Sequence, residues 1–160
     1  MQALKKISSA LDKICGVCIV IMLGLMVIFT MAQIICRTWF TALSWSEEAT
    51  RFLLIWSTFF GATCVYRHSG NIAITALQGA MPPKVKKVMT ITVHVVCLIL
   101  FVVLFVNGVQ YCNKQVRMAA AIPVKMKYIY SCLPISMVIL AIHALTMMLE
   151  EIFSLKKEVK

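Results

Sequence analysis

The sequence predicts an all-α integral membrane protein with four transmembrane helices and additional short interfacial helices. Of its 160 residues, 61% are hydrophobic, and the mean hydropathy is +0.91, which is far above that of soluble domains. Its charged residues lie outside the long apolar runs, as lipid-facing helices require. The length leaves room for four crossings and little else, so we expect residues 1–160 to form a single membrane domain.

The first apolar run predicts a retained transmembrane helix over residues 14–36. This run carries no charge, and it exceeds the roughly 20 residues that a helix needs to cross a bilayer. It is too long for the apolar region of a signal peptide and has no convincing small-residue cleavage site. Before it, residues 1–13 place Leu4, Ile7 and Leu11 at helical spacing, which predicts a short interfacial helix.

The second predicted span, residues 44–66, begins with two glutamates. Ser44 and Glu47 form an S-x-x-E capping box, and Glu47 and Glu48 lie where the helix dipole favours carboxylates. Arg51 follows at the spacing of a helical ion pair with either glutamate. We therefore expect a structural ion pair of Glu48 or Glu47 with Arg51 at the headgroup level, where charges are tolerated.

The second half of the chain predicts two further spans, residues 88–112 and 128–149. Between the second and third spans, residues 71–80 are uncharged but too short to cross, which favours a surface-lying or re-entrant helix. The loop at residues 113–127 contains four cations and no acid. In the last span, Pro134 removes one helical hydrogen bond and predicts a kink.

The distribution of basic residues predicts that both termini face the cytoplasm. Ten Lys and Arg residues fall on the side of the termini and six on the other, the latter being Arg37, Arg51, Lys114, Arg117, Lys125 and Lys127. The glutamates of the second span and the loop at 113–127 then face outward. Because the basic residues lie in short loops, the net charge of +10 is a topology signal, and no basic stripe interleaved with aromatics suggests nucleic-acid binding.

Two alternatives involve chemistry inside the membrane. His94 and His143 are expected at similar depth on antiparallel helices, where two imidazoles can hold a haem, as in a small haem b anchor for electron transfer. The simpler interpretation is that each histidine bonds a neighbouring helix. Cys15 and Cys18 have the C-x-x-C spacing of a thiol oxidoreductase, but without the strand-to-helix context of that site.

The remaining features indicate an accessory role. Ser57 and Gly61 give the second span a small-xxx-small face, suited to packing within this chain or against a helix of another protein. None of the predicted spans has an acid at its middle, where ion-coupled carriers usually keep ionisable groups. We therefore expect no catalytic residue, no substrate-binding residue, no metal and no cofactor.

Several stretches resemble the small membrane subunit of tripartite ATP-independent periplasmic (TRAP) transporters. The resemblance lies in the run Glu47 to Trp56, in Phe59-Phe60-Gly61-Ala62, in Arg67 to Ile74, and in Tyr130 to Ser136 with its Leu-Pro pair. The chain departs from the family pattern at Asn71, at Thr75 and around Lys125-Met126-Lys127, so roles tied to those positions are not carried over.

The resemblance implies a non-enzymatic permease subunit in the bacterial inner membrane, surrounded by lipid. Its partners would be a large membrane subunit, which moves an organic anion (a carboxylate or sialic acid) on a sodium gradient, and a periplasmic solute-binding protein. The small subunit would brace the large one, with Glu47, Glu48 and Arg51 serving assembly. By charge, we expect an acidic docking surface of the binding protein to be attracted to four cations, Lys114, Arg117, Lys125 and Lys127.

Overall fold

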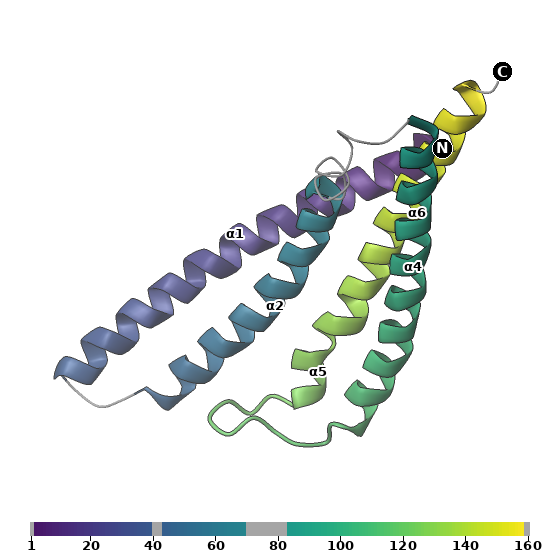
Figure 1. Cartoon of the computed structure of the whole chain (residues 1–160). Coiled ribbons are helices and arrows are strands. Elements are labelled where there is room, and N and C mark those ends of the chain that lie inside the picture. Colours follow the sequence, from purple (N-terminus) through teal and green to yellow (C-terminus); the bar gives the residue numbers. More distant parts are fainter. Residues whose placement is uncertain (1, 40–42, 70–82, 159–160) are drawn as a thin grey trace.

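The computed structural model describes residues 2–39, 43–69 and 83–158 (Figure 1). The short helix expected at residues 71–80, with Asn71 and Thr75, lies outside the described residues. The elements are α1 (Gln2–Trp39), α2 (Ser44–Ser69), α4 (Pro83–Lys114), α5 (Met126–Tyr130) and α6 (Cys132–Glu158). No strand occurs in the described ranges, where an isolated bridge between Met118 and Lys125 is the one β-type pairing. The predicted all-α class is confirmed.

Three helical segments of the described chain are long and apolar enough to cross a membrane. They are Leu4–Trp39, Val88–Lys114 and Met126–Phe153. α2, which begins with two glutamates and Arg51 and ends with Arg67 and His68, lies outside this set. Its crossing, and with it the count of four spans, stays a prediction.

The first helix differs from expectation at its start. The interfacial segment expected at residues 1–13 and the span expected at 14–36 form one continuous helix, α1. Residues 1–15 contain no proline or glycine, so no residue there interrupts the helical hydrogen bonds.

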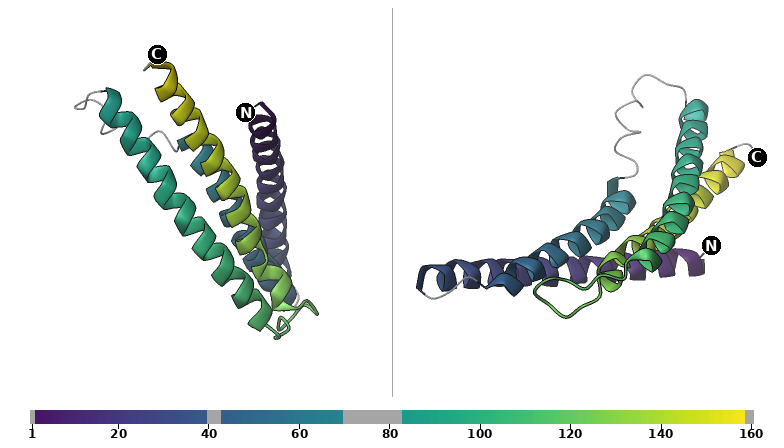
Figure 2. Two further views of the ribbon diagram at one scale, coloured as in Figure 1. Left: turned by 90° about the vertical axis from the view of Figure 1, so that its right-hand side faces the viewer. Right: turned by 90° about the horizontal axis from the view of Figure 1, so that it is seen from below.

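The helices form two antiparallel pairs. α1 packs along α2, α4 packs along α6, and α6 also contacts α2 and α1. In Figure 1 the two pairs spread apart from the end that holds the chain termini toward the end that holds the loop joining α4 to α5, whereas in the left view of Figure 2 the helices come together toward that loop. We call these the terminal end and the loop end of the molecule.

A small apolar core joins the pairs. Phe101 of α4 lies against Met137, Leu140 and Ala144 of α6, and Phe59 and Tyr66 of α2 pack onto this cluster. The Tyr66 and Phe101 rings meet edge to face, with centroids 5.4 Å apart. α2 therefore shares apolar contacts with both helices of the other pair, α4 and α6.

The last predicted span is interrupted, as its proline predicts. α5 ends at Tyr130, and α6 begins at Cys132, two residues before Pro134. A proline ring clashes with the carbonyl four residues earlier, here that of Tyr130, and offers no N–H to it. Ser131 lies at the junction, where its hydroxyl donates to the carbonyl oxygens of Lys127 and Tyr128.

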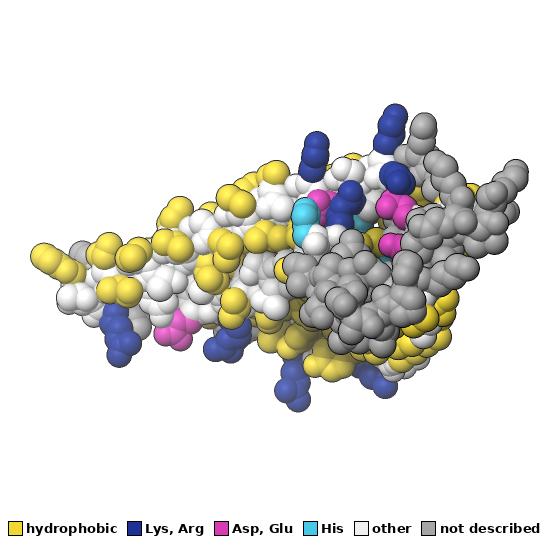
Figure 3. All heavy atoms as spheres, turned by 45° about the horizontal axis from the view of Figure 1, so that its top comes forward, with side chains coloured by type: hydrophobic (Ala, Val, Ile, Leu, Met, Phe, Trp, Pro, Cys, Tyr) yellow, Lys and Arg dark blue, Asp and Glu magenta, His cyan; other side chains and the backbone are white. Residues whose placement is uncertain are grey.

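Most of the surface is apolar. Large hydrophobic side chains stand exposed along α1 and α4, with Val20 at 71% and Val96 at 60% of their full exposure. In Figure 3 such side chains are spread over the part of the face that is not grey, and a histidine lies beside acidic and basic side chains. These apolar faces suit lipid or another membrane protein, since soluble monomers rarely leave such areas uncovered.

Candidate functional site: the two polar ends of the bundle

At the loop end, the carboxylate of Glu48 binds the tip of the loop. Its Oε1 accepts a hydrogen bond from the N–H of Ala120 at 2.8 Å. Its Oε2 accepts from the N–H groups of Ala121 at 2.7 Å and Ile122 at 3.0 Å. Three successive amides directed at one carboxylate form an anion-binding concavity, and bonds to a charged acceptor are the stronger kind. Glu48 thereby joins α2 to the connection between α4 and α5.

The loop itself, residues 115–125, is a narrow hairpin. The N–H of Ala119 donates to the carbonyl of Val124 at 3.0 Å, and the N–H of Met126 donates to the carbonyl of Arg117 at 3.0 Å. These bonds hold the two sides of the loop together, and Glu48 holds its tip. The loop is therefore fixed both at its base and at its end.

Glu47 and Ser46 face the other way, toward α1. The amide of Gln33 donates to Glu47 Oε1 at 2.8 Å, and the hydroxyl of Ser46 donates to the Phe29 carbonyl at 3.1 Å. The Phe29 and Trp45 rings also meet edge to face. The two adjacent glutamates thus bind different partners, one on α1 and one on the loop.

The predicted ion pair of Glu48 or Glu47 with Arg51 stays a prediction, although the charge of Arg51 does attract the Glu48 carboxylate. Among the described residues, the ion pairs include none between Arg51 and Glu47 or Glu48. Three amides donate to the Glu48 carboxylate, and Gln33 donates to that of Glu47. The Arg51 side chain is exposed on α2.

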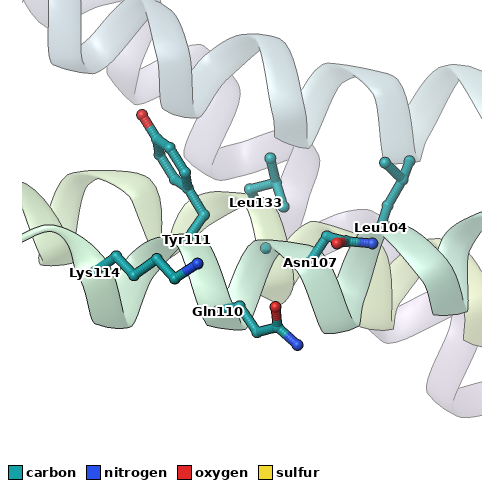
Figure 4. A pocket seen from close by; sticks show the side chains of 7 residues that line it. Leu104, Asn107, Gln110, Tyr111, Lys114 and Leu133 are labelled. Atoms are coloured by element: carbon teal, nitrogen blue, oxygen red, sulfur yellow. The ribbon is translucent and has the colours of Figure 1, made fainter.

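The four cations proposed for docking lie at this same end. Lys114, Arg117, Lys125 and Lys127 are all exposed. Lys114 also borders a groove of about 360 Å³ between α4 and α6 (Figure 4), which is lined by Leu104, Asn107, Gly108, Gln110, Tyr111, Lys114 and Leu133. The structure therefore places all four cations on or beside the hairpin that Glu48 holds.

The two small residues of α2, Ser57 and Gly61, lie in different surroundings. Ser57 is buried, and its hydroxyl donates to the Leu54 carbonyl of its own helix at 3.0 Å. A Cβ added at Gly61 would meet nothing within 4 Å. Ser57 thus packs within the chain, whereas Gly61 leaves room for an outside helix.

A second polar cluster joins three helices at the terminal end. Arg67 of α2 donates from Nη1 to the Ser8 hydroxyl, and its Nε lies 3.7 Å from Asp12 Oδ2. Ser8 Oγ lies 2.7 Å from Nδ1 of His143 on α6. His68 Nδ1 is 3.7 Å from Asp12 Oδ1. The cluster therefore ties α1, α2 and α6 together.

A scan against protein families identifies the chain. The model of the DctQ component of tripartite ATP-independent periplasmic transporters matches residues 13–154. The chain belongs to this family. The predicted resemblance is confirmed, and the family is a transporter component rather than an enzyme family. With three apolar helices of spanning length, this DctQ-family chain is a multi-pass membrane protein.

A curated relative agrees with the family. A protein of Haemophilus influenzae, named as a TRAP transporter small permease protein, is 31% identical to this chain over 78 residues. The match covers 48% of this chain and 46% of that protein, so the chain matches about half the length of the relative.

The haem alternative is not supported for this DctQ-family chain. His143 bonds Ser8 of α1, and Nδ1 of His94 lies 2.9 Å from the Tyr66 hydroxyl of α2. Both imidazoles are at most 2% exposed. Each histidine thus joins its helix to a neighbour, which is the simpler of the two interpretations.

The C-x-x-C pair gains no support either. Cys15 is buried, Cys18 is half-buried, and both are free thiols. Cysteines in such surroundings behave as small apolar residues, because the thiolate form is disfavoured away from water.

Sequence reasoning missed Asp12 and Ser8. Both fall in the segment interpreted as an interfacial helix, so neither was expected to contact α2 or α6. A signal did exist, since Asp12 is the one acid of residues 1–46 and the Arg67-His68 turn was predicted on the same side of the membrane. The loop amides that bind Glu48 carry no sequence signal, because every residue except proline has an N–H.

Proposed function

We propose that this chain is the small permease subunit of a TRAP importer in the bacterial inner membrane. It braces the large membrane subunit during sodium-coupled, binding-protein-dependent uptake of an organic anion of the carboxylate or sialic acid type. The observation that carries the proposal is the match to the DctQ component family over residues 13–154. Bracing requires surfaces for a partner helix, and two features supply them.

The first feature is the exposed apolar face of α1. Its exposed side chains include Val17, Val20, Ile28 and Ile35. The second is the open space at Gly16 and Gly24 of α1 and at Gly61 of α2, where an added Cβ meets nothing within 4 Å. Small residues let the backbones of membrane helices approach closely. We propose that α1 and α2 pack against the large subunit through these surfaces.

The topology in this proposal has four crossings with both termini in the cytoplasm. It is supported by the bias of Lys and Arg toward the terminal side and by the length of α2, 26 residues. Cysteine labelling in intact cells with a membrane-impermeant maleimide tests it, with the unsubstituted chain as background for the native cysteines.

With four crossings, Val116→Cys is labelled, whereas Lys6→Cys and a cysteine added at the C-terminus are protected. With three crossings, by α1, α4 and the α5–α6 segment, the loop would lie inside and the C-terminus outside. Labelling of Val116→Cys together with protection of the C-terminal cysteine therefore shows that α2 crosses, and the reverse pattern shows that it does not.

Charge supports a role for the loop end in docking. Lys114, Arg117, Lys125 and Lys127 are exposed there, while both nearby carboxylates are engaged by hydrogen bonds. Such a surface attracts an acidic partner and speeds its encounter. We propose that the partner is the periplasmic solute-binding protein.

Purification from native membranes tests the function. The chain, tagged at its C-terminus and extracted in mild detergent, should bring down a large multi-span protein and, at lower yield, a soluble solute-binding protein. Recovery of the chain alone, or with proteins unrelated to transport, would refute the proposal.

A further inference from the structure

We infer that Glu48 is a latch that holds the 115–125 hairpin as a rigid docking face, made of apolar anchors within a ring of cations. This inference rests on the proposed function, because it assigns a conformation and contact residues to the docking of the solute-binding protein. The latch consists of the three hydrogen bonds from Ala120, Ala121 and Ile122 to the Glu48 carboxylate.

The apolar part of the face is unusually exposed. Val116 is 84% exposed, Met118 is 64% exposed, and Tyr128, just beyond the hairpin, is 63% exposed. Arg117 lies between Val116 and Met118 in the chain, and Lys125 is bridged to Met118. Large apolar side chains that carry most of the contact, surrounded by polar or charged ones, are typical of protein interfaces.

The latch explains how a loop can present such a face. Ordering a free loop costs about 1–2 kcal/mol of backbone entropy per residue, a cost otherwise borne at the moment of binding. Here the pairing of Met118 with Lys125 and the hydrogen bonds to Glu48 order the loop before the partner binds. A loop of fixed shape favours a folded protein partner over lipid, since a fluid headgroup surface demands no fixed shape.

Charge selects the partner. The described residues of the loop end carry six cations, namely Arg37, Arg51, Lys114, Arg117, Lys125 and Lys127, against two acids, Glu47 and Glu48. Both acids are hydrogen-bonded within the chain, so the charge exposed at the loop end is positive. The partner that fits is an acidic protein surface with apolar recesses for Met118 and Tyr128.

Trypsin added outside right-side-out vesicles measures the latch itself. It cuts after Arg117, Lys125 and Lys127, and cleavage requires local opening of the loop. Glu48→Gln keeps the shape of the side chain but removes its charge, so cleavage should be faster by roughly fivefold or more. Glu47→Gln, whose side chain contacts Gln33 and not the loop, should be cut at the wild-type rate. Equal rates for wild type and Glu48→Gln would overturn the latch.

Binding kinetics measure the docking face. The transporter complex, purified in lipid nanodiscs, is immobilised, and the solute-binding protein that co-purifies with it is the probe. Glu48→Gln should weaken binding by roughly tenfold, while the large subunit stays in the complex. Met118→Ser should raise the dissociation rate, and Arg117→Glu should lower the association rate and its dependence on salt.

The outcomes separate this inference from the proposed function. If no large subunit co-purifies with the wild-type chain, the proposed function fails. If both partners co-purify but Glu48→Gln and Met118→Ser bind the probe as wild type does, the docking face is refuted and the function stands. If anionic lipid vesicles alone protect the loop from trypsin, lipid is the occupant and the inference is overturned.

Discussion

The side chain of Leu133 occupies the space that a Cβ at Gly108 would fill. Gly108 lies on α4 and Leu133 on the first turn of α6, so the two helices are in close contact here. Glycine is needed at this position for the close approach of a neighbouring side chain rather than for backbone conformation, since no described residue has a positive φ. This contact sets the spacing of the α4–α6 pair at the loop end.

Gly108→Ala should destabilise the chain by about 1–3 kcal/mol, the usual cost of overpacking. The loss is measured as a lower thermal midpoint of the purified protein in detergent. Gly24→Ala is the matched control, because a Cβ there meets nothing within 4 Å. The double variant Gly108→Ala/Leu133→Ala should regain part of the thermal midpoint that Gly108→Ala loses. A normal midpoint for Gly108→Ala would contradict the close α4–α6 contact.

Ser8→Ala should loosen the terminal end of the bundle. It removes the acceptor of Arg67 and the partner of His143, two contacts that join α1 to other helices. Interhelical hydrogen bonds in membranes are each worth roughly 0.6–2 kcal/mol, so the expected loss is about 1–3 kcal/mol in the free energy of unfolding. Denaturation in mixed micelles measures this loss. Ser9→Ala removes the neighbouring hydroxyl and should leave stability unchanged; equal losses in both variants would argue against a specific contact.

Gly61→Leu tests whether α2 packs on the large subunit. In the isolated chain the thermal midpoint should stay the same, since the position faces open space. In the complex, the added side chain should block close approach and reduce recovery of the large subunit with the tagged chain. Val65→Leu changes a 60% exposed apolar residue of the same helix and serves as the control. Full recovery with Gly61→Leu would place the interface elsewhere.

Arg51→Ala should weaken assembly without affecting solute capture by the binding protein. The guanidinium is exposed and forms no salt bridge within 4 Å to either nearby glutamate among the described residues, although its charge attracts the Glu48 carboxylate. It can therefore also approach an acid of the large subunit. Loss of one member of a buried interfacial charge pair costs about 2–5 kcal/mol. Co-purification of the large subunit measures the effect. Arg51→Lys keeps the positive charge and should preserve part of the association. Unchanged association in Arg51→Ala would remove this residue from the interface.

The helices were largely predictable from the sequence, because lipid restricts where charges fall. The first three predicted spans lie inside α1, α2 and α4, and the fourth is divided between α5 and α6 at Ser131, near the predicted interruption at Pro134. α2 also begins at Ser44, the residue at which the sequence predicted the helix to start, whereas the capping-box hydrogen bonds stay a prediction. These features depend on local composition and on one proline, both of which are visible in a single chain.

The polar contacts were predicted poorly, for a different reason. Glu48 was expected to pair with a neighbour on its own helix, and its bonds to the backbone of residues 120–122, more than seventy positions away, were not expected. Asp12 and Arg67 meet across two helices in the same way. Nothing local in the sequence specifies such partners, because they depend on how the helix pairs come together.

The donors that hold Glu48 belong to the main chain. The side chains of Ala120 and Ala121 are therefore not used by the latch. Substitution of either residue by serine, asparagine or glycine keeps the same N–H, so the latch should tolerate it. Proline is the exception, since it alone removes the donor. A reporter group attached to a cysteine substituted at either alanine would sit at the tip of the hairpin, leave the main-chain hydrogen bonds to Glu48 in place, and report on each arrival of a partner.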